Sequence, residues 1–183
     1  AAARCPGKPG EPGADIFGEW NDQTDDIGPI WGDQGSSLVT RMFLLWDLDR
    51  VPRTGLVSAT MTLYTAVAWP PVLVDVHQVC GAWPAYASAL DYTPKWADQP
   101  ATSPLRSASF ITPAADLTAI NVDVTVLVRR WLEYGHPNYG VMLRKHDESK
   151  AVPPGSQPRP YAVLTMRTYQ PTDGTPKLTI VVP

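Results

Sequence analysis

The chain has few charged residues and no large excess of either sign. Its 183 residues include 15 basic and 18 acidic side chains, 18% in total, for a net charge of −3. A protein that binds nucleic acid or lies on an anionic membrane normally carries a basic excess or runs of Lys and Arg. The longest apolar runs have the length of a strand, too short to span a bilayer. We therefore expect neither nucleic acid as a partner nor insertion into a membrane.

Cysteine is also scarce, since Cys5 and Cys80 are the only two. Two cysteines make neither a zinc site nor a disulfide framework. The chain begins "AAARC", without Met or an apolar signal segment, which is typical of a mature N-terminus after signal removal, although a start chosen for expression would look the same. The expected localisation is secreted, extracellular or at the cell surface. In that setting a Cys5–Cys80 bridge is the disulfide candidate, with two free thiols or a bridge between subunits as alternatives.

Local catalytic motifs are missing as well. The sequence contains no HExxH, GxSxG or CxxC pattern, and His77, His136 and His146 are isolated from one another. We therefore predict no enzymatic activity, no catalytic residues and no cofactor other than a structural calcium ion.

What the chain has in abundance is proline, with 20 residues scattered between short apolar runs. This punctuation is typical of a loop-rich all-β protein. The runs "SLVTRMFLLWDL", "VLVDVHQV", "YGVMLRK" and "RPYAVLTMRTY" have strand character. In "SATMTLYTAV", Ala59, Met61 and Leu63 alternate with polar residues and predict one buried face. The fold class is thus an all-β, jelly-roll-like antiparallel β-sandwich with extended terminal arms.

One short helix near 124–132 is the exception to the β pattern. Val124, Leu127, Val128 and Trp131 recur at helical spacing after an extended start. The stretch 81–115, which is rich in proline and includes Trp83, is expected to be irregular. Three regions follow: an extended Pro/Gly arm with an acidic, aromatic turn region over 1–35, the sandwich over 36–169, and a linker plus an extra strand over 170–183.

Several motifs in order suggest a family. They are "RMFLLWDLDRVP", "VSATMTLY", "VDVHQV", "AW", "WADQP", "VDVTVLVRRWL", "NYGVMLR" and "RPYAVLTM". Over about residues 36–169 the chain resembles the DNRLRE-type secreted β-sandwich module, which is related to alginate-binding carbohydrate-binding modules and to TGF-β propeptide-like domains. The resemblance implies a non-catalytic module of secreted or surface proteins. Trp46, Trp83, Trp96 and Trp131 fall on these motifs, and we expect them to pack in the core or anchor loops.

Three further groups of side chains are candidate sites. Exposed aromatics can stack on sugars or anchor an interface, and the tryptophans outside the motifs are Trp20, Trp31 and Trp69. Oxygen-rich clusters suit calcium, which makes a weak metal candidate of Asp22, Asp25, Asp26 and Asp33. A basic face would suit the carboxylates of an acidic polysaccharide such as alginate, and its candidates are Arg41, Arg53, Arg129, Arg130, Arg144 and Lys145. Plain packing, solvated turn carboxylates and a scattered charged surface are the respective alternatives.

The chain ends on the apolar strand "PKLTIVVP". This strand can cap an edge of its own sheet or pair with a neighbouring copy by donor-strand exchange. The residues of this self-assembly strand are Leu178, Thr179, Ile180, Val181 and Val182. The sequence favours a structural or adhesive subunit that assembles with copies of itself into a fibre or surface layer. The alternative is a monomeric carbohydrate-binding module for an acidic polysaccharide.

Overall fold

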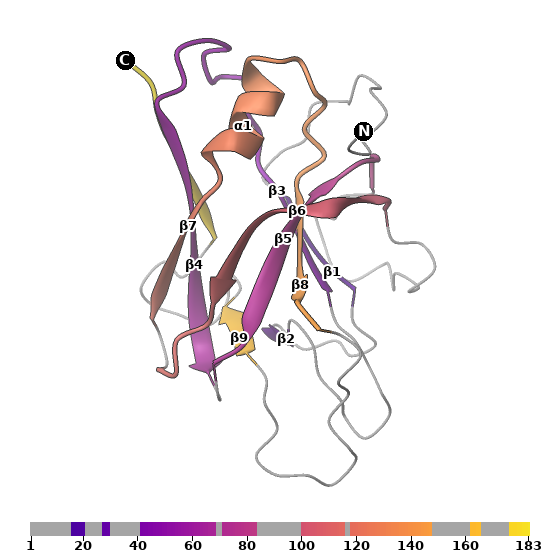
Figure 1. Cartoon of the computed structure of the whole chain (residues 1–183), viewed down its shortest axis with the longest axis vertical. Helices are drawn as coiled ribbons and strands as arrows, with labels where there is room; N and C mark the ends of the chain where they lie inside the picture. Colours follow the sequence, from indigo (N-terminus) through magenta and orange to yellow (C-terminus); the bar gives the residue numbers. More distant parts are fainter. Residues whose placement is uncertain are drawn as a thin grey trace, which may run out of the picture.

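The chain folds as a β-sandwich of two antiparallel sheets, seen in a computed structural model (Figure 1). The structure describes residues 16–20, 27–29, 41–68, 71–83, 100–115, 118–147, 162–165 and 176–183. The strands and the helix α1 are β1 (Ile16–Trp20), β2 (Ile27–Pro29), β3 (Arg41–Leu45), β4 (Ser58–Ala68), β5 (Leu73–Val79), β6 (Thr102–Ile111), β7 (Ala119–Asp123), α1 (Thr125–Leu132), β8 (Val141–Lys145), β9 (Ala162–Thr165) and β10 (Lys177–Val181). The all-β sandwich expected from the sequence is confirmed.

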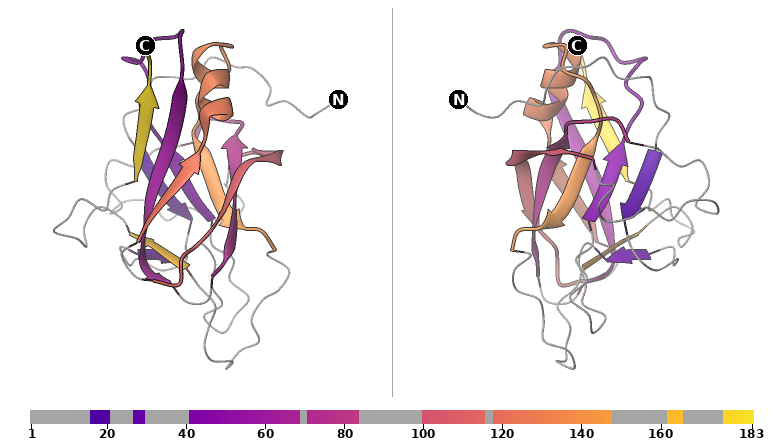
Figure 2. Two further views of the ribbon diagram at one scale, coloured as in Figure 1. Left: turned by 60° about the vertical axis from the view of Figure 1, so that its left-hand side comes forward. Right: turned by 90° about the vertical axis from the view of Figure 1, so that its right-hand side faces the viewer.

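The first sheet has the strand order β1-β3-β8-β5-β6, and the right-hand view of Figure 2 shows it face on. The second sheet has the order β10-β4-β9-β2. The strand β7 also pairs with β4, along the edge opposite β10. The two strands β1 and β2 lie within residues 1–35, so the sandwich takes strands from a region predicted to be an arm and turns. They pair with β3 and β9, respectively.

The core lies between the sheets and follows the alternation of the strands. Ala59, Met61 and Leu63 of β4 are fully buried, as their spacing predicts, and face Val74 and Val76 of β5 in one apolar cluster. The helix closes one end of the sandwich. Leu127, Val128 and Trp131, which the helical spacing predicted, are buried. Leu132 is buried as well.

The expectation of an irregular stretch over 81–115 is wrong for residues 102–111, which form β6. Two features hide this strand from pattern reading. It is the outermost strand of the first sheet, where Pro104 is tolerated because a missing N–H need not break a ladder. Its register against β5 also shifts on both sides of His77, so that the alternation of apolar and polar residues is interrupted.

Candidate functional site

A buried carboxylate lies on the outer face of the first sheet. Val74 and Val76 point into the core, so Asp75 between them points outward. The Asp75 side chain is nevertheless only 4% exposed. Its Oδ2 accepts a hydrogen bond from Nδ1 of His146 at 2.7 Å, and its Oδ1 lies 3.6 Å from Nη1 of Arg106, an ion pair without a hydrogen bond. One carboxylate therefore holds two cationic or protonatable side chains from β6 and from the end of β8.

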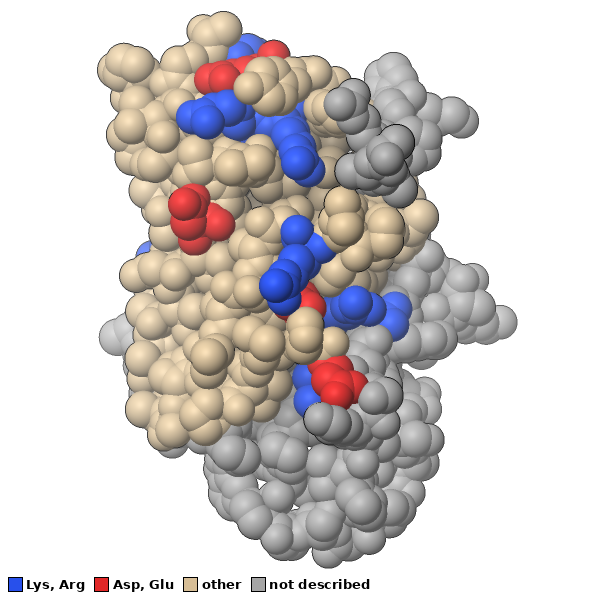
Figure 3. Space-filling view, in the orientation of Figure 1, with Lys and Arg blue, Asp and Glu red and all other residues tan. Residues whose placement is uncertain are grey.

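The register of the sheet adds two more cations. Asp75 lies opposite Arg144 on β8, and the Met42–Leu143 pair places Arg41 of β3 next to Arg144. Paired residues project to the same face of a sheet. The outer-face cluster thus consists of Asp75 with Arg41, Arg106, Arg144 and His146. Figure 3 shows basic and acidic side chains gathered in the middle of the face over β5, β6 and β8.

Solvent reaches the cluster at two of its members. The Arg106 side chain is 54% exposed and that of His146 is 48% exposed, whereas the carboxylate between them is buried. Arginine binds carboxylates through a planar fork of N–H donors. The Arg106 guanidinium can therefore present N–H donors to an anion, while the buried Asp75 carboxylate fixes its orientation.

The predicted basic face is only partly assembled. Arg41 and Arg144 share the outer face, but Lys145 pairs with the core residue Val74 and so projects to the opposite side. Arg53 lies outside the sheets, 4.0 Å from Asp49. Arg129 and Arg130 belong to α1. The six candidates therefore do not form one surface.

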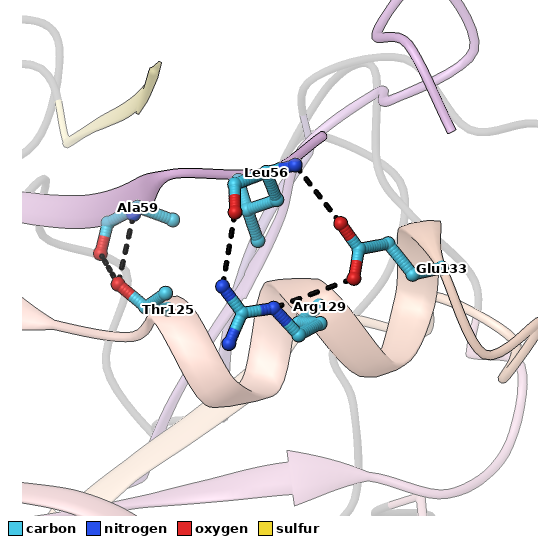
Figure 4. A network of polar contacts seen from close by, with 5 residues as sticks. All are labelled: Leu56, Ala59, Thr125, Arg129 and Glu133. Atoms are coloured by element: carbon cyan, nitrogen blue, oxygen red, sulfur yellow. Dashed lines mark hydrogen bonds and ion pairs between the residues drawn. The ribbon is translucent and has the colours of Figure 1, made fainter. Parts of the chain in front are cut away.

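Arg129 instead holds α1 against the start of β4 (Figure 4). Its Nη2 donates to the carbonyl oxygen of Leu56 at 2.9 Å, and its Nε lies 3.4 Å from Oε2 of Glu133. The other carboxylate oxygen of Glu133 accepts from the Leu56 N–H, and the Thr125 hydroxyl accepts from the Ala59 N–H at 3.0 Å. Thr125 and Arg129 of α1 and Glu133 just after it thus satisfy backbone groups at the start of β4 and just before it, beyond the end of β7.

The tryptophans on the family motifs have the expected packing roles where the structure describes them. Trp131 is buried in the core, and Trp46 packs against it. Trp83 donates from Nε1 to the carbonyl oxygen of Tyr139 at 2.8 Å, and its ring centroid lies 5.9 Å from that of Phe43. Trp96 lies outside the described residues.

The other candidate residues lie wholly or partly outside the described part of the chain. Trp31 and Trp69 and the calcium candidates Asp22, Asp25, Asp26 and Asp33 lie outside the described residues. Trp20 ends β1, opposite Arg41, but its side chain is not among those the structure describes. Among the described side chains, no group of three or more His, Cys, Asp or Glu residues could hold a metal ion.

Cys80 is disulfide-bonded. The chain has one other cysteine, Cys5, which lies outside the described residues. The pairing of Cys5 with Cys80 therefore stays the prediction made from the sequence.

The C-terminal strand pairs within its own chain. β10 runs antiparallel to β4, from Lys177 opposite Thr62 to Val181 opposite Ser58, and the left-hand view of Figure 2 shows the two strands side by side. Leu178 and Ile180 pack against the core, and the Val181 carbonyl accepts from the Val57 N–H at 2.9 Å. Of the two arrangements that the sequence left open, the structure has the one in which the strand caps its own sheet.

Sequence reasoning missed the members of the outer-face cluster other than Arg41 and Arg144. A signal for Asp75 was present, because a carboxylate in the middle of "VLVDVHQV" has to be paired or exposed. Nothing local identified Arg106, since its strand was not recognised. His146 follows β8, and only the pairing of β8 with β5 brings it to Asp75.

The fold and this cluster define a class: an all-β sandwich with a polar, cation-bearing face on one sheet. The sequence matches no protein-family model and no curated protein. The resemblance to the DNRLRE-type module therefore still depends on the motifs alone. None of the described residues forms a helix long and apolar enough to cross a bilayer.

Proposed function

We propose that this protein is a non-catalytic, secreted β-sandwich module that binds an acidic polysaccharide, such as alginate, through the outer-face cluster. The observation that carries the proposal is the geometry around Asp75. Two half-exposed side chains, Arg106 and His146, are held by one buried carboxylate on the outer face of the sheet, and the Arg106 guanidinium keeps N–H donors for a ligand. Preorganised donors lose less conformational entropy when they bind a ligand than free surface side chains do.

The cis pairing of β10 supports this function over self-assembly. Donor-strand exchange needs a strand that is free to enter a neighbour, or a groove that stands open. Here β10 fills the position beside β4, and its apolar residues Leu178 and Ile180 are already packed. Part of the reason to expect a fibre or surface layer of copies of this chain is that these apolar side chains need a partner, and the core of their own chain provides one.

The test is the affinity for sodium alginate of the wild type and of two arginine variants. Arg106→Ala removes a donor of the cluster and should weaken binding about ten-fold, the effect of losing one charge-assisted hydrogen bond. Arg130→Ala is the matched control, because Arg130 is exposed on α1 and lies outside the cluster. It should bind as the wild type does, and wild-type binding should weaken as salt is raised.

Two results would contradict the proposal. One is a wild-type protein that does not bind alginate at low salt. The other is an equal loss in both arginine variants, because that would indicate a diffuse charge effect instead of a site.

A further inference from the structure

Next to the outer-face cluster lies a pair of exposed apolar side chains. Leu73 of β5 is 37% exposed and Ile111 of β6 is 65% exposed. They are opposite one another in the β5–β6 register, one at the start of its strand and one at the end. Residues paired across a sheet project to the same face, so both lie on the outer face.

The pair is continuous with the polar cluster. The backbone N–H of His146 donates to the Leu73 carbonyl at 2.9 Å, which places His146 directly beside Leu73. Ser109 and Asp75 form the next outward pair of the same two strands. Residues two apart on a strand are separated by about 7 Å, so Asp75, which contacts both Arg106 and His146, follows Leu73 at about that distance along β5.

We infer that Leu73 and Ile111 form an apolar shelf that contacts the C–H face of a pyranose ring, while the carboxylate of that ring binds Arg106. This inference rests on the proposed function and adds the two residues that contact the sugar ring itself, so that the site distinguishes a carboxylated sugar from other polyanions. Charge complementarity selects this occupant: the cluster has three arginines and one carboxylate, so it favours an anionic group, and the shelf favours an apolar face on the same unit. A pyranose uronate has both on one ring.

A comparison of two polyanions tests the shelf. Sodium alginate supplies carboxylates on sugar rings, and poly-L-glutamate supplies carboxylates without rings. Leu73→Ser and Ile111→Ser should each weaken alginate binding about five-fold, as expected for lost contact with a partly buried aliphatic side chain. Neither substitution should change the affinity for poly-L-glutamate, whereas Arg106→Ala should weaken the binding of both polymers.

Leu105→Ser is the matched control. Leu105 is also an exposed apolar residue of β6, 56% exposed, but it immediately precedes Arg106 and so points away from the face that carries the cluster. Its substitution should leave both affinities unchanged. All of these side chains are exposed, so we expect every variant to keep the wild-type circular dichroism spectrum.

The failures of the two proposals are distinguishable. If the shelf variants bind alginate as the wild type does, or lose both polymers equally, while Arg106→Ala still weakens both, the shelf is refuted and the proposed function stands. If the wild type binds neither polymer, the proposed function fails, and the shelf fails with it.

Discussion

At the scale of single residues, the turn before β8 has contacts that are specific to its side chains. Asn138 donates from Nδ2 to the Trp46 carbonyl at 2.7 Å and accepts from the Gly140 N–H through Oδ1 at 3.0 Å. The Tyr139 carbonyl accepts from Trp83. Gly140 has φ +83°, and a Cβ there would overlap the carbonyl of Leu44. The motif "NYG" therefore joins β8 to the segment after β3 and to Trp83.

This geometry predicts a large difference between two glycine substitutions. Gly140→Ala should lower the free energy of unfolding by about 1–3 kcal/mol or more, because alanine is strained at positive φ and the Leu44 backbone has to move. Gly81→Ala is the control, since a Cβ at Gly81 meets nothing within 4 Å. Urea denaturation of both variants measures the difference. Equal stabilities would show that the turn adapts without cost.

At the scale of elements, α1 and the residue after it bind the part of the chain just beyond the point where β7 stops pairing with β4. The β7 strand pairs with β4 as far as Asp123 opposite Thr60. Beyond it, Thr125, Arg129 and Glu133 use side chains to bind the backbone of residues 56–59 (Figure 4). Asp123 stabilises the junction between β7 and α1, because its Oδ1 accepts a hydrogen bond from the N–H of Thr125, the first residue of the helix, at 2.9 Å.

The junction should show a pH dependence. Hydrogen bonds from the side chain and then the backbone of Thr125 hold the pKa of Asp123 below its ordinary value. A carboxyl with a lowered folded-state pKa adds stability above its unfolded pKa, about 3.9, and this stability is lost as pH falls through the folded value. At pH 7, Asp123→Ala should therefore be less stable than the wild type, by less than about 1 kcal/mol because the exposed carboxylate is screened by solvent.

Denaturation at several pH values provides the measurement. The stability difference between wild type and Asp123→Ala should persist from pH 7 to about 5 and shrink below about pH 4. A difference that stays constant down to pH 2 would mean that the charge of Asp123 has no part in it.

At the scale of the whole molecule, β10 completes the second sheet by pairing with one edge of β4. The end of the chain lies at the same end of the sandwich as α1 (Figure 1). Pro183 is close to Gly55 there, since a Cβ added to Gly55 would lie 3.2 Å from the Pro183 ring. Leu178 and Ile180 contact the core, while Lys177, Thr179 and Val181 face outward and are exposed. A strand held this way belongs to its own sheet.

Substitutions in β10 test that statement. Ile180→Ala should lower the free energy of unfolding by about 1–2 kcal/mol, because it removes a half-buried aliphatic side chain. Thr179→Ala, at the adjacent exposed position, should change it by less than about 0.5 kcal/mol. Light scattering of the wild type should give the mass of a single chain. A polymeric wild type that Ile180→Ala converts to monomers would instead favour strand exchange.

The sequence by itself determined the local elements whose side chains repeat with a clear period. The alternation of Ala59, Met61 and Leu63 predicted β4, and the spacing of Val124, Leu127 and Trp131 predicted α1, because each needs only a neighbour at a set distance along the chain. Tertiary structure alone decided the outer-face cluster. Asp75, Arg106 and His146 lie far apart in the sequence, and only the β6-β5-β8 order brings them together. Tertiary structure also decided which sheet β10 joins. An apolar terminal strand can pair with any open sheet edge, and only the folded chain shows that it pairs with β4 of its own sheet.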